Sequence, residues 1–280
     1  MPRAALVDRV SLGIRSLHGV PLPMCLIALS WRTHARYPLL IAANRDEFHA
    51  RPADPAAHWQ DTPQVYGGRD RLLGGGWLAV SRRARLAAVT NVRRMLPPNP
   101  RALSRGRLVA DFVRADDSAL EFCEALMPHA QEYGGFNLLL WDGACLRFAT
   151  NQGETGESRE VDPGIHVLSN ATLDTPWPKS ERLRTAMQQT GGHDTPDIET
   201  LFTALADTAI APDAALPNTG LELERERWLS SPFIRGPEYG TRASTVVLVA
   251  QDRLRFVERR FGPNGRADGD SDRVLPLAVD

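Results

Sequence analysis

The chain alternates between pairs of short apolar runs and segments with helical periodicity. Runs of about four to eight apolar residues bounded by turn signals are typical of buried strands. They predict strands at 25–31, 38–43, 76–80, 85–90, 136–141, 145–150, 165–169, 244–250 and 253–261. Apolar residues spaced for one face of a helix predict helices at 104–114, 118–129, 178–189 and 197–206.

The order of these elements favours one fold class. Most strands come in adjacent pairs, and the helix pairs stand between strand pairs. The strongest hairpin signal is Asp142-Gly143 between the runs at 136–141 and 145–150. Strands that pair with their sequence neighbours form antiparallel sheets. We therefore expect an α+β fold of two mainly antiparallel sheets with helices outside them, and not a doubly wound parallel sheet.

Residues 1–23 stand apart from the rest of the chain. They contain three arginines and one acid, and they lack the apolar stretch of a secretory signal. We favour the interpretation that Met24 is the true start and that residues 1–23 are a mis-called leader; a transit peptide and a removable propeptide are the alternatives. A single domain is expected over 24–262. The polar, Asp/Gly-rich tail at 263–280 is expected to fray.

Composition and charge narrow the function classes. Of 280 residues, 42% are apolar and 24% are charged, as in ordinary globular proteins. The formal net charge of −1 indicates no nucleic-acid or anionic-membrane partner. No apolar run approaches the roughly 18 residues that span a bilayer, so we expect no integral membrane segment.

The cysteines bear on the compartment and on metals. Cys25, Cys123 and Cys145 are too few, and odd in number, for a disulfide framework. They fit a reducing compartment, so we expect a cytoplasmic protein. Cys123 and Cys145 fall on predicted regular elements and are expected to be structural. No zinc-ligand spacing is present, and the sequence does not specify the oligomeric state.

Cys25 is the candidate nucleophile because it directly follows a methionine. If the chain began at Cys25, one residue would carry both a thiol and a free α-amine. The amine can then serve as the base for the thiol, which is the chemistry of N-terminal-nucleophile hydrolases. Its reference pKa of about 7.7–8.0 needs only a small downward shift for this role. The alternative is that Cys25 is an ordinary buried strand residue.

Polar residues at the ends of strands supply candidate partners for this cysteine. The sequence Asn-Arg-Asp-Glu at 44–47 follows the second apolar run. Arg45 would lower the pKa of the amine and of the thiol, and Asp46 would orient the amine. Asn91 and Asn170 each end a strand-like run and have the neutral N–H donors that suit an oxyanion hole. All four could instead be ordinary turn residues.

Taken in order, these residues resemble the NRDE family, which includes the transport and Golgi organisation 2 proteins. The resemblance covers nearly all of the chain from Met24 to about Phe261. The matching segments are Met24-Cys25-Leu26-Ile27, Ala42-Ala43-Asn44-Arg45-Asp46-Glu47, Arg51-Pro52, Gly67-Gly68-Arg69-Asp70, Gly75-Gly76-Trp77-Leu78-Ala79-Val80, Thr90-Asn91, Gly134-Gly135-Phe136-Asn137-Leu138, Leu168-Ser169-Asn170, Leu173-Asp174-Thr175-Pro176-Trp177-Pro178-Lys179 and Tyr239-Gly240-Thr241-Arg242 with Ser244-Thr245-Val246. The chain departs from the family pattern in carrying 23 residues before Met24.

The resemblance implies a four-layer αββα sandwich like that of N-terminal-nucleophile hydrolases, in agreement with the strand and helix pattern. The family is similar, more distantly, to penicillin V acylases and bile-salt hydrolases. By that analogy the catalytic residues are Cys25, Arg45, Asp46, Asn91, Asn170 and Arg242. The cysteine would be nucleophile and base, and the first arginine and the aspartate would tune it. The asparagines would bind the oxyanion, and the last arginine would be a second cation near the thiolate.

Two functions follow from the resemblance. The first is hydrolysis of a linear amide C–N bond through a thioester on Cys25, acting on a small-molecule amide or lipid-like ligand with no required cofactor. The alternative is a non-catalytic protein that binds and traffics haem, lipid or acyl-CoA, in which haem is held by Cys25 with His34 or His49. We favour the enzyme-like site, because the asparagines and Arg242 have no evident purpose in haem ligation. The sequence names no substrate.

Overall fold

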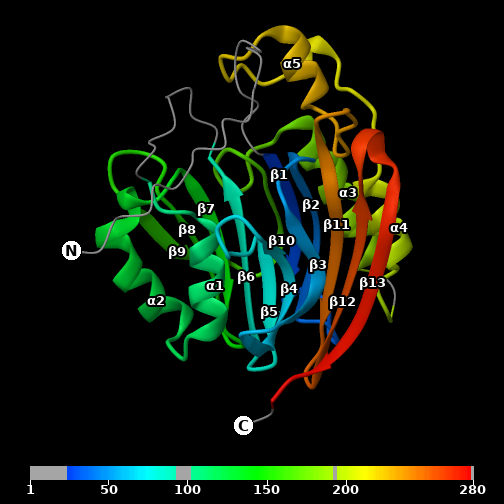
Figure 1. The fold of residues 1–280 in the computed structure, drawn as a ribbon. Coiled ribbons are helices and arrows are strands. Elements are labelled where there is room, and N and C mark those ends of the chain that lie inside the picture. The colour runs from blue at the N-terminus through cyan, green and yellow to red at the C-terminus, as the bar shows by residue number, and fades with distance from the viewer. Residues whose placement is uncertain (1–23, 93–101, 192–193, 279–280) are drawn as a thin grey trace, which may run out of the picture.

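The computed structural model describes residues 24–92, 102–191 and 194–278, and in it two antiparallel sheets pack face to face (Figure 1). The first sheet has the strand order β10-β1-β2-β11-β12-β13. Its strands are β1 (Met24–Trp31), β2 (Leu39–Phe48), β10 (Gly164–Leu168), β11 (Tyr239–Val249), β12 (Arg253–Phe261) and β13 (Ala267–Pro276). The second sheet runs in chain order through β3 (Ala53–Trp59), β4 (Thr62–Asp70), β5 (Leu78–Ser81), β6 (Arg85–Asn91), β7 (Phe136–Trp141), β8 (Leu146–Thr150) and β9 (Glu157–Glu160).

Helices cover the outer face of each sheet. In Figure 1, α1 (Gly106–Arg114) and α2 (Ala119–Leu126) lie on the left, outside the second sheet. On the right, α3 (Pro178–Thr190) and α4 (Ile198–Leu205) lie outside the first sheet. The short helix α5 (Leu223–Trp228) and the 3-10 turns η1 (Met127–Glu132), η2 (Asp213–Ala215) and η3 (Pro263–Gly265) complete the described elements. The predicted four-layer αββα sandwich is therefore confirmed.

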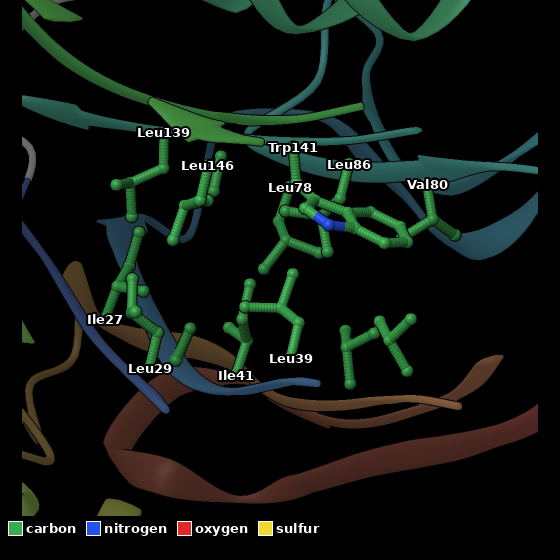
Figure 2. Close-up of a cluster of buried hydrophobic side chains, with 14 of the residues drawn as sticks. Ile27, Leu29, Leu39, Ile41, Leu78, Val80, Leu86, Leu139, Trp141 and Leu146 are labelled. Carbon is green, nitrogen blue, oxygen red and sulfur yellow. The ribbon is translucent and has the colours of Figure 1, made fainter. Parts of the chain in front are cut away.

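The apolar runs are continuous because both faces of the sheets are covered. Along β1, Ile27 and Leu29 point into the layer between the sheets, whereas Leu26 and Ala28 pack against α3 and α4. Figure 2 shows the inner layer, in which Leu39 and Ile41 of the first sheet face Leu78, Leu139 and Trp141 of the second. This inner cluster fixes the register of the sheets and thereby the positions of the polar residues at the strand ends.

The structure corrects three of our expectations. Strand β2 continues to Phe48, so residues 44–47 lie within a strand and not in a turn after it. The tail does not fray: β13 pairs antiparallel with β12 along most of its length. Most of its side chains are exposed and polar, so the strand leaves little apolar signal in the sequence; backbone pairing, the Arg255–Asp272 ion pair and the buried Leu275 hold it in place. Helix α1 begins after Arg105, not at Ser104.

Other elements follow the sequence closely. Ser118 caps α2 in a capping box with Glu121, as a helix starting there requires. The predicted hairpin forms β7 and β8. Strands β3, β4 and β9 were not predicted, because their polar residues interrupt the apolar pattern. None of the described helices is long and apolar enough to cross a membrane.

Candidate functional site

Strand pairing places the predicted nucleophile and its partners side by side. Cys25 of β1 lies opposite Arg45 of β2, and Asp46 lies between Met24 on one side and Thr241 of β11 on the other. Antiparallel neighbours hold opposed Cα atoms within about 4.5–5.5 Å. Residues from three strands are thus brought together by backbone register alone, because 44–47 are part of the sheet.

A cavity of about 370 Å³ opens beside these strands. Of the six predicted site residues, Cys25, Arg45, Asp46, Asn91 and Arg242 line it. The first sheet supplies four of them, and Asn91 comes from the end of β6 in the second sheet. The cavity therefore lies where both sheets contribute, and its size suits a small organic ligand, for which sites of about 300–1,000 Å³ are usual.

The Cys25 thiol is held in its neutral form. Burial raises its pKa to about 12, and the charge of Asp46 adds to the rise. Arg45 and a hydrogen bond from the backbone N–H of Asp46 act in the opposite direction. The side chain is 7% exposed, and the carbonyl oxygen of Cys25 accepts a hydrogen bond from Ser169 Oγ at 3.0 Å. With its amide bond to Met24 intact, this residue is a poor nucleophile.

Asp46 is a buried carboxyl with an incomplete set of hydrogen bonds. Its Oδ1 accepts from Thr241 Oγ1 at 2.6 Å, whereas Oδ2 has no hydrogen-bond donor among the described residues. Burial raises the pKa of Asp46 to about 6, against the opposing effects of Lys179, Thr241 and Arg45. A carboxylate oxygen left without a donor costs folding free energy unless something fills it.

The two asparagines take different places. Asn91 is 7% exposed and lines the cavity. Asn170 is not among the residues that line it; its Nδ2 donates to the backbone oxygen of Asn91 at 2.8 Å. Ser169, whose hydroxyl contacts both Asn170 and the carbonyl of Cys25, ties the two together. Asn170 thus contacts the backbone of Asn91, and its neighbour Ser169 contacts the backbone of Cys25.

The arginines expected to act on the thiol both lie in the cavity wall. Arg45 Nη2 lies 3.8 Å from Glu47 Oε2. Arg242 donates from Nη1 to the backbone oxygens of Phe48 and Arg51. Burial lowers the pKa of Arg242, and Arg45 lowers it further. Two guanidiniums close to each other make this end of the cavity favourable for negative charge.

Three functional candidates were missed at the sequence level. Lys179, the single lysine of the chain, is only 2% exposed and acts on Asp46 from the start of α3. Thr241 donates directly to that aspartate. Arg105, just before α1, lines the cavity. A lone lysine inside a segment shared with the family was a usable signal, because lysines are rarely buried without a charged partner.

The histidines considered as haem ligands lie elsewhere. His34 Nδ1 accepts from the backbone N–H groups of Arg36 and Tyr37, and His49 Nε2 contacts the backbone oxygen of Gly236. Neither histidine is among the residues lining the cavity that holds Cys25. In the part of the chain that the structure describes, no group of three His, Cys, Asp or Glu residues could hold a metal ion.

The family model and the curated relatives that match this chain point to the same family. The family described as Transport and Golgi organisation 2 matches residues 24–263. The Bos taurus protein named Transport and Golgi organization protein 2 homolog is 37% identical over 244 residues, covering 80% of this chain and 86% of the relative. The Homo sapiens homolog is 32% identical with the same coverage, and the Drosophila melanogaster protein is 30% identical over 247 residues.

Two solved structures are similar at much lower identity. The Caenorhabditis elegans N-acylethanolamine-hydrolyzing acid amidase ortholog has a TM-score of 0.48 and 9% identity, covering 80% of this chain and 92% of that one. A mutant of the conjugated bile acid hydrolase from Clostridium perfringens has a TM-score of 0.49 and 7% identity, covering 92% and 97%. Both likenesses concern the fold alone.

Proposed function

Because this chain belongs to the Transport and Golgi organisation 2 family and holds a buried cysteine in a polar cavity, we propose that it hydrolyses a linear amide through a thioester on Cys25. The observation that carries the proposal is the β1–β2–β11 register. It sets Cys25 opposite Arg45, with Asp46 as the next residue and Arg242 in the same cavity wall. This proposal requires a free α-amine on Cys25, and therefore cleavage of the bond between Met24 and Cys25.

Cleavage would change the charge state of the nucleophile. A new α-ammonium beside Asp46 supplies a donor of the kind that Asp46 Oδ2 lacks among the described residues. The same positive charge favours the thiolate, against the burial that raises the thiol pKa to about 12 in the uncleaved chain. With the thiol at that pKa, only on the order of one molecule in 10⁵ carries a thiolate at pH 7. Cleavage is thus the proposed activating step.

The reaction then follows from the residues present. The α-amine takes the thiol proton, and Sγ forms a bond to the substrate carbonyl carbon. When the C–N bond breaks, the departing amine takes that proton from the α-ammonium. Water, deprotonated by the same amine, next attacks the thioester; the C–S bond breaks, the acid is released and the thiol is restored.

The developing oxyanion would be bound at the Asn91 side of the cavity. Asn91 lies in the wall, so its side-chain N–H is the direct candidate donor. Asn170 contributes through its hydrogen bond to the Asn91 backbone as well as through the amide role that the resemblance implies. The nearby guanidiniums of Arg45 and Arg242 favour negative charge on the thiolate and on the oxyanion alike.

The test begins with the N-terminus. Protein expressed from Met24 is analysed by intact mass, and its Cys25 is labelled with a chloroacetamide probe alongside the full-length chain. We expect loss of Met24, labelling at Cys25 in the trimmed protein, and much slower labelling in the chain that retains the upstream residues. Hydrolysis of a panel of N-acyl amides should disappear in Cys25→Ala and persist in the control Cys145→Ala. Unlabelled Cys25 together with undiminished hydrolysis in Cys25→Ala would overturn the proposal.

One observation favours an apolar portion in the ligand. Leu73 and Leu103 line the cavity and yet remain 58% and 37% exposed, and Leu72 beside them is 62% exposed. Exposed apolar side chains at a cavity rim are typical of a binding surface. They support a lipid-like or acylated ligand, both for an amide substrate and for the alternative of binding without turnover. Saturable binding of an acyl amide by Cys25→Ala, with no hydrolysis in the trimmed wild type, would favour that alternative.

A further inference from the structure

The arginines of the cavity wall are not equivalent. Four of them have a carboxylate oxygen at 2.7 to 3.9 Å: Arg45, Arg51, Arg69 and Arg260. Arg105 and Arg242, the remaining two, have no ion-pair partner within the described ranges. Arg242 instead donates to two backbone oxygens of the β2 end. Arg105 makes one hydrogen bond, from Nη1 to the oxygen of Gly135 at 3.1 Å.

The acids of the wall are occupied with other groups. Glu47 and Asp70 pair with Arg51, Asp46 accepts from Thr241, Asp54 lies 3.7 Å from Arg71, and Glu258 accepts from the N–H of Ala56. Asp268 is exposed and acts on Arg242, not on Arg105. The Arg105 guanidinium therefore lines the cavity without a carboxylate partner of its own among the described residues.

Close contacts at glycines surround the Arg105–Gly106 segment. A Cβ on Gly75 would lie 2.4 Å from the carbonyl carbon of Gly106, so only glycine lets the β4–β5 connection meet the start of α1. The N–H of Gly76 donates to the Gly106 oxygen at 3.0 Å across the same contact. On the other side, a Cβ on Gly134 would lie 3.3 Å from Arg105 Nη1. The backbone before the helix is thus held by close packing, and the guanidinium lies against the backbone of Gly134 and Gly135.

Arg105 also interacts electrostatically with the nucleophile. Burial lowers the pKa of Arg105, and negative charge on Glu47, or on Cys25 when its thiol is ionised, raises it. It comes from the segment before α1, whereas Cys25 comes from the first sheet, so the two face the cavity from different layers. The positive end of the α1 dipole lies at Gly106 in the same wall and adds to the attraction for an anion.

We propose that Arg105 binds an anionic group, a carboxylate or a phosphate, carried by the amide on which Cys25 acts. The inference deepens the proposed function and rests on it. A guanidinium held by backbone contacts and free of acids offers paired N–H donors that match a planar carboxylate or a phosphate. Such an anion would pair with a guanidinium that has no carboxylate partner among the described residues, while the rim leucines contact an apolar part of the molecule.

The experiment compares matched electrophiles on the trimmed protein. Chloroacetyl amides of glycine, β-alanine and 4-aminobutyrate carry a carboxylate at increasing distance, and their primary carboxamides are the neutral counterparts. Aminoethylphosphonate supplies the phosphate arm. In each case Cys25 Sγ forms a bond to the chloroacetyl carbon as chloride leaves, and intact mass gives the labelling rate. Arg105→Gln is set against Arg107→Gln, which removes an exposed arginine of the same segment that pairs with Asp111.

We expect at least one anionic probe to label wild type about tenfold faster than its neutral counterpart, as one charge-assisted hydrogen bond allows. That ratio should fall to near one in Arg105→Gln and persist in Arg107→Gln. Using the ratio within each variant cancels any general loss of thiol reactivity or folding. The carboxylate and phosphonate probes decide which anion is preferred. Equal rates for both probe types, or a preference that survives in Arg105→Gln, would overturn the anion site.

A second measurement separates this inference from the proposed function. N-acetylglycine should raise the Tm of wild type but not of Arg105→Gln, relative to N-acetylglycinamide. If no probe labels Cys25 but this Tm shift is present, the nucleophile proposal fails and the anion site stands. If labelling occurs without any anion preference or Tm shift, the anion site fails and the nucleophile stands.

Discussion

Two aspartates, one buried and one partly exposed, show how differently this fold treats a carboxyl group. Asp174, after β10, accepts hydrogen bonds from His166 Nδ1 at 2.7 Å, from the N–H of Val167 at 2.9 Å and from Arg184 at 2.9 Å. Against the penalty of burial, these contacts lower the pKa of Asp174 to about 2. Asp46 has one donor, Thr241, and its pKa is raised to about 6. Both oxygens of Asp174 accept hydrogen bonds from described residues, whereas Asp46 Oδ2 has no donor among them.

The contrast separates a structural site from a candidate catalytic one. Asp174 lies with His166 and Arg184 and holds β10 against α3, so its contacts stabilise the fold. Asp46 lies beside Cys25 in the cavity, where its missing donor leaves the folded state less stable than it could be. Residues that cost stability in this way are typical of functional sites. Substitutions at the two aspartates and at their neighbours therefore test whether Asp46 is catalytic and Asp174 structural.

Asp46→Asn should give the largest change. We expect amide hydrolysis to fall about 10²- to 10⁴-fold, because the amide cannot orient or stabilise the α-ammonium. The wild-type aspartate should also stabilise the folded state more at low pH than at high pH. The folded-state pKa of about 6 exceeds the unfolded value of about 3.9, so the wild-type contribution is full below pH 4 and is lost as pH rises through 6.

Denaturant unfolding at several pH values, on chains in which the bond between Met24 and Cys25 is intact, measures this second effect. The free energy of unfolding of the variant minus that of wild type should rise by about 2–3 kcal/mol between pH 4 and pH 8. A constant offset from any packing change does not alter that slope. A difference that stays flat across this range would show that Asp46 titrates normally, and the contrast with Asp174 would disappear.

Lys179→Met should shift the pH dependence of catalysis. After burial itself, Lys179 is the largest influence on Asp46, and it favours the carboxylate. Without it the pKa of Asp46 rises further, so the acid limb of the rate profile should move to higher pH, with a loss of about tenfold or more at pH 6. Methionine keeps a similar volume in this buried position. An unmoved acid limb in a folded variant would exclude Lys179 as a positioning residue for Asp46.

The sequence predicted the part of this site on β1 and β2 better than the contributions of more distant segments. Residues 24–25 and 44–47 are local neighbours on adjacent strands, so a short apolar hairpin already brings them together. The register with Thr241 depends on a strand about 200 positions away in the chain, and no local pattern encodes it. Lys179 has its effect only because α3 packs over β1 and β10.

Arg105 was missed for a related reason. It is one of many arginines, and its exclusion from ion pairs appears only when the cavity is assembled from both sheets. The fold was easier to predict than the site, because the order of buried strands and amphipathic helices indicates the layers but not which polar residues meet. Strand β13 shows where that reasoning stops, because an edge strand with mostly exposed side chains has little apolar pattern to detect.

Asp174→Asn tests the structural side of the contrast. Its folded pKa of about 2 lies below the unfolded value, so its contribution is present above pH 4 and is lost as pH falls through 2. Because the side chain is 34% exposed, we discount for solvent screening and expect a loss of about 1–2 kcal/mol at pH 7. The loss should shrink by pH 3, while the hydrolysis rate at 25 °C stays near that of wild type. A large rate effect without a stability effect would reverse the assignment.

A matched pair of threonines on β11 should give the subtlest change. Thr241 Oγ1 donates to Asp46 and accepts from the N–H of Ile234, whereas Thr245 Oγ1 is buried without a hydrogen-bond partner in the described structure. Thr241→Val should destabilise the fold by about 1–3 kcal/mol and raise the acid limb of the rate profile by roughly half to one pH unit. Thr245→Val, an equally buried isosteric change, should be neutral or slightly stabilising and leave the profile in place. If both variants shift the profile alike, the effect belongs to packing of the strand, and the Thr241 hydroxyl does not tune Asp46.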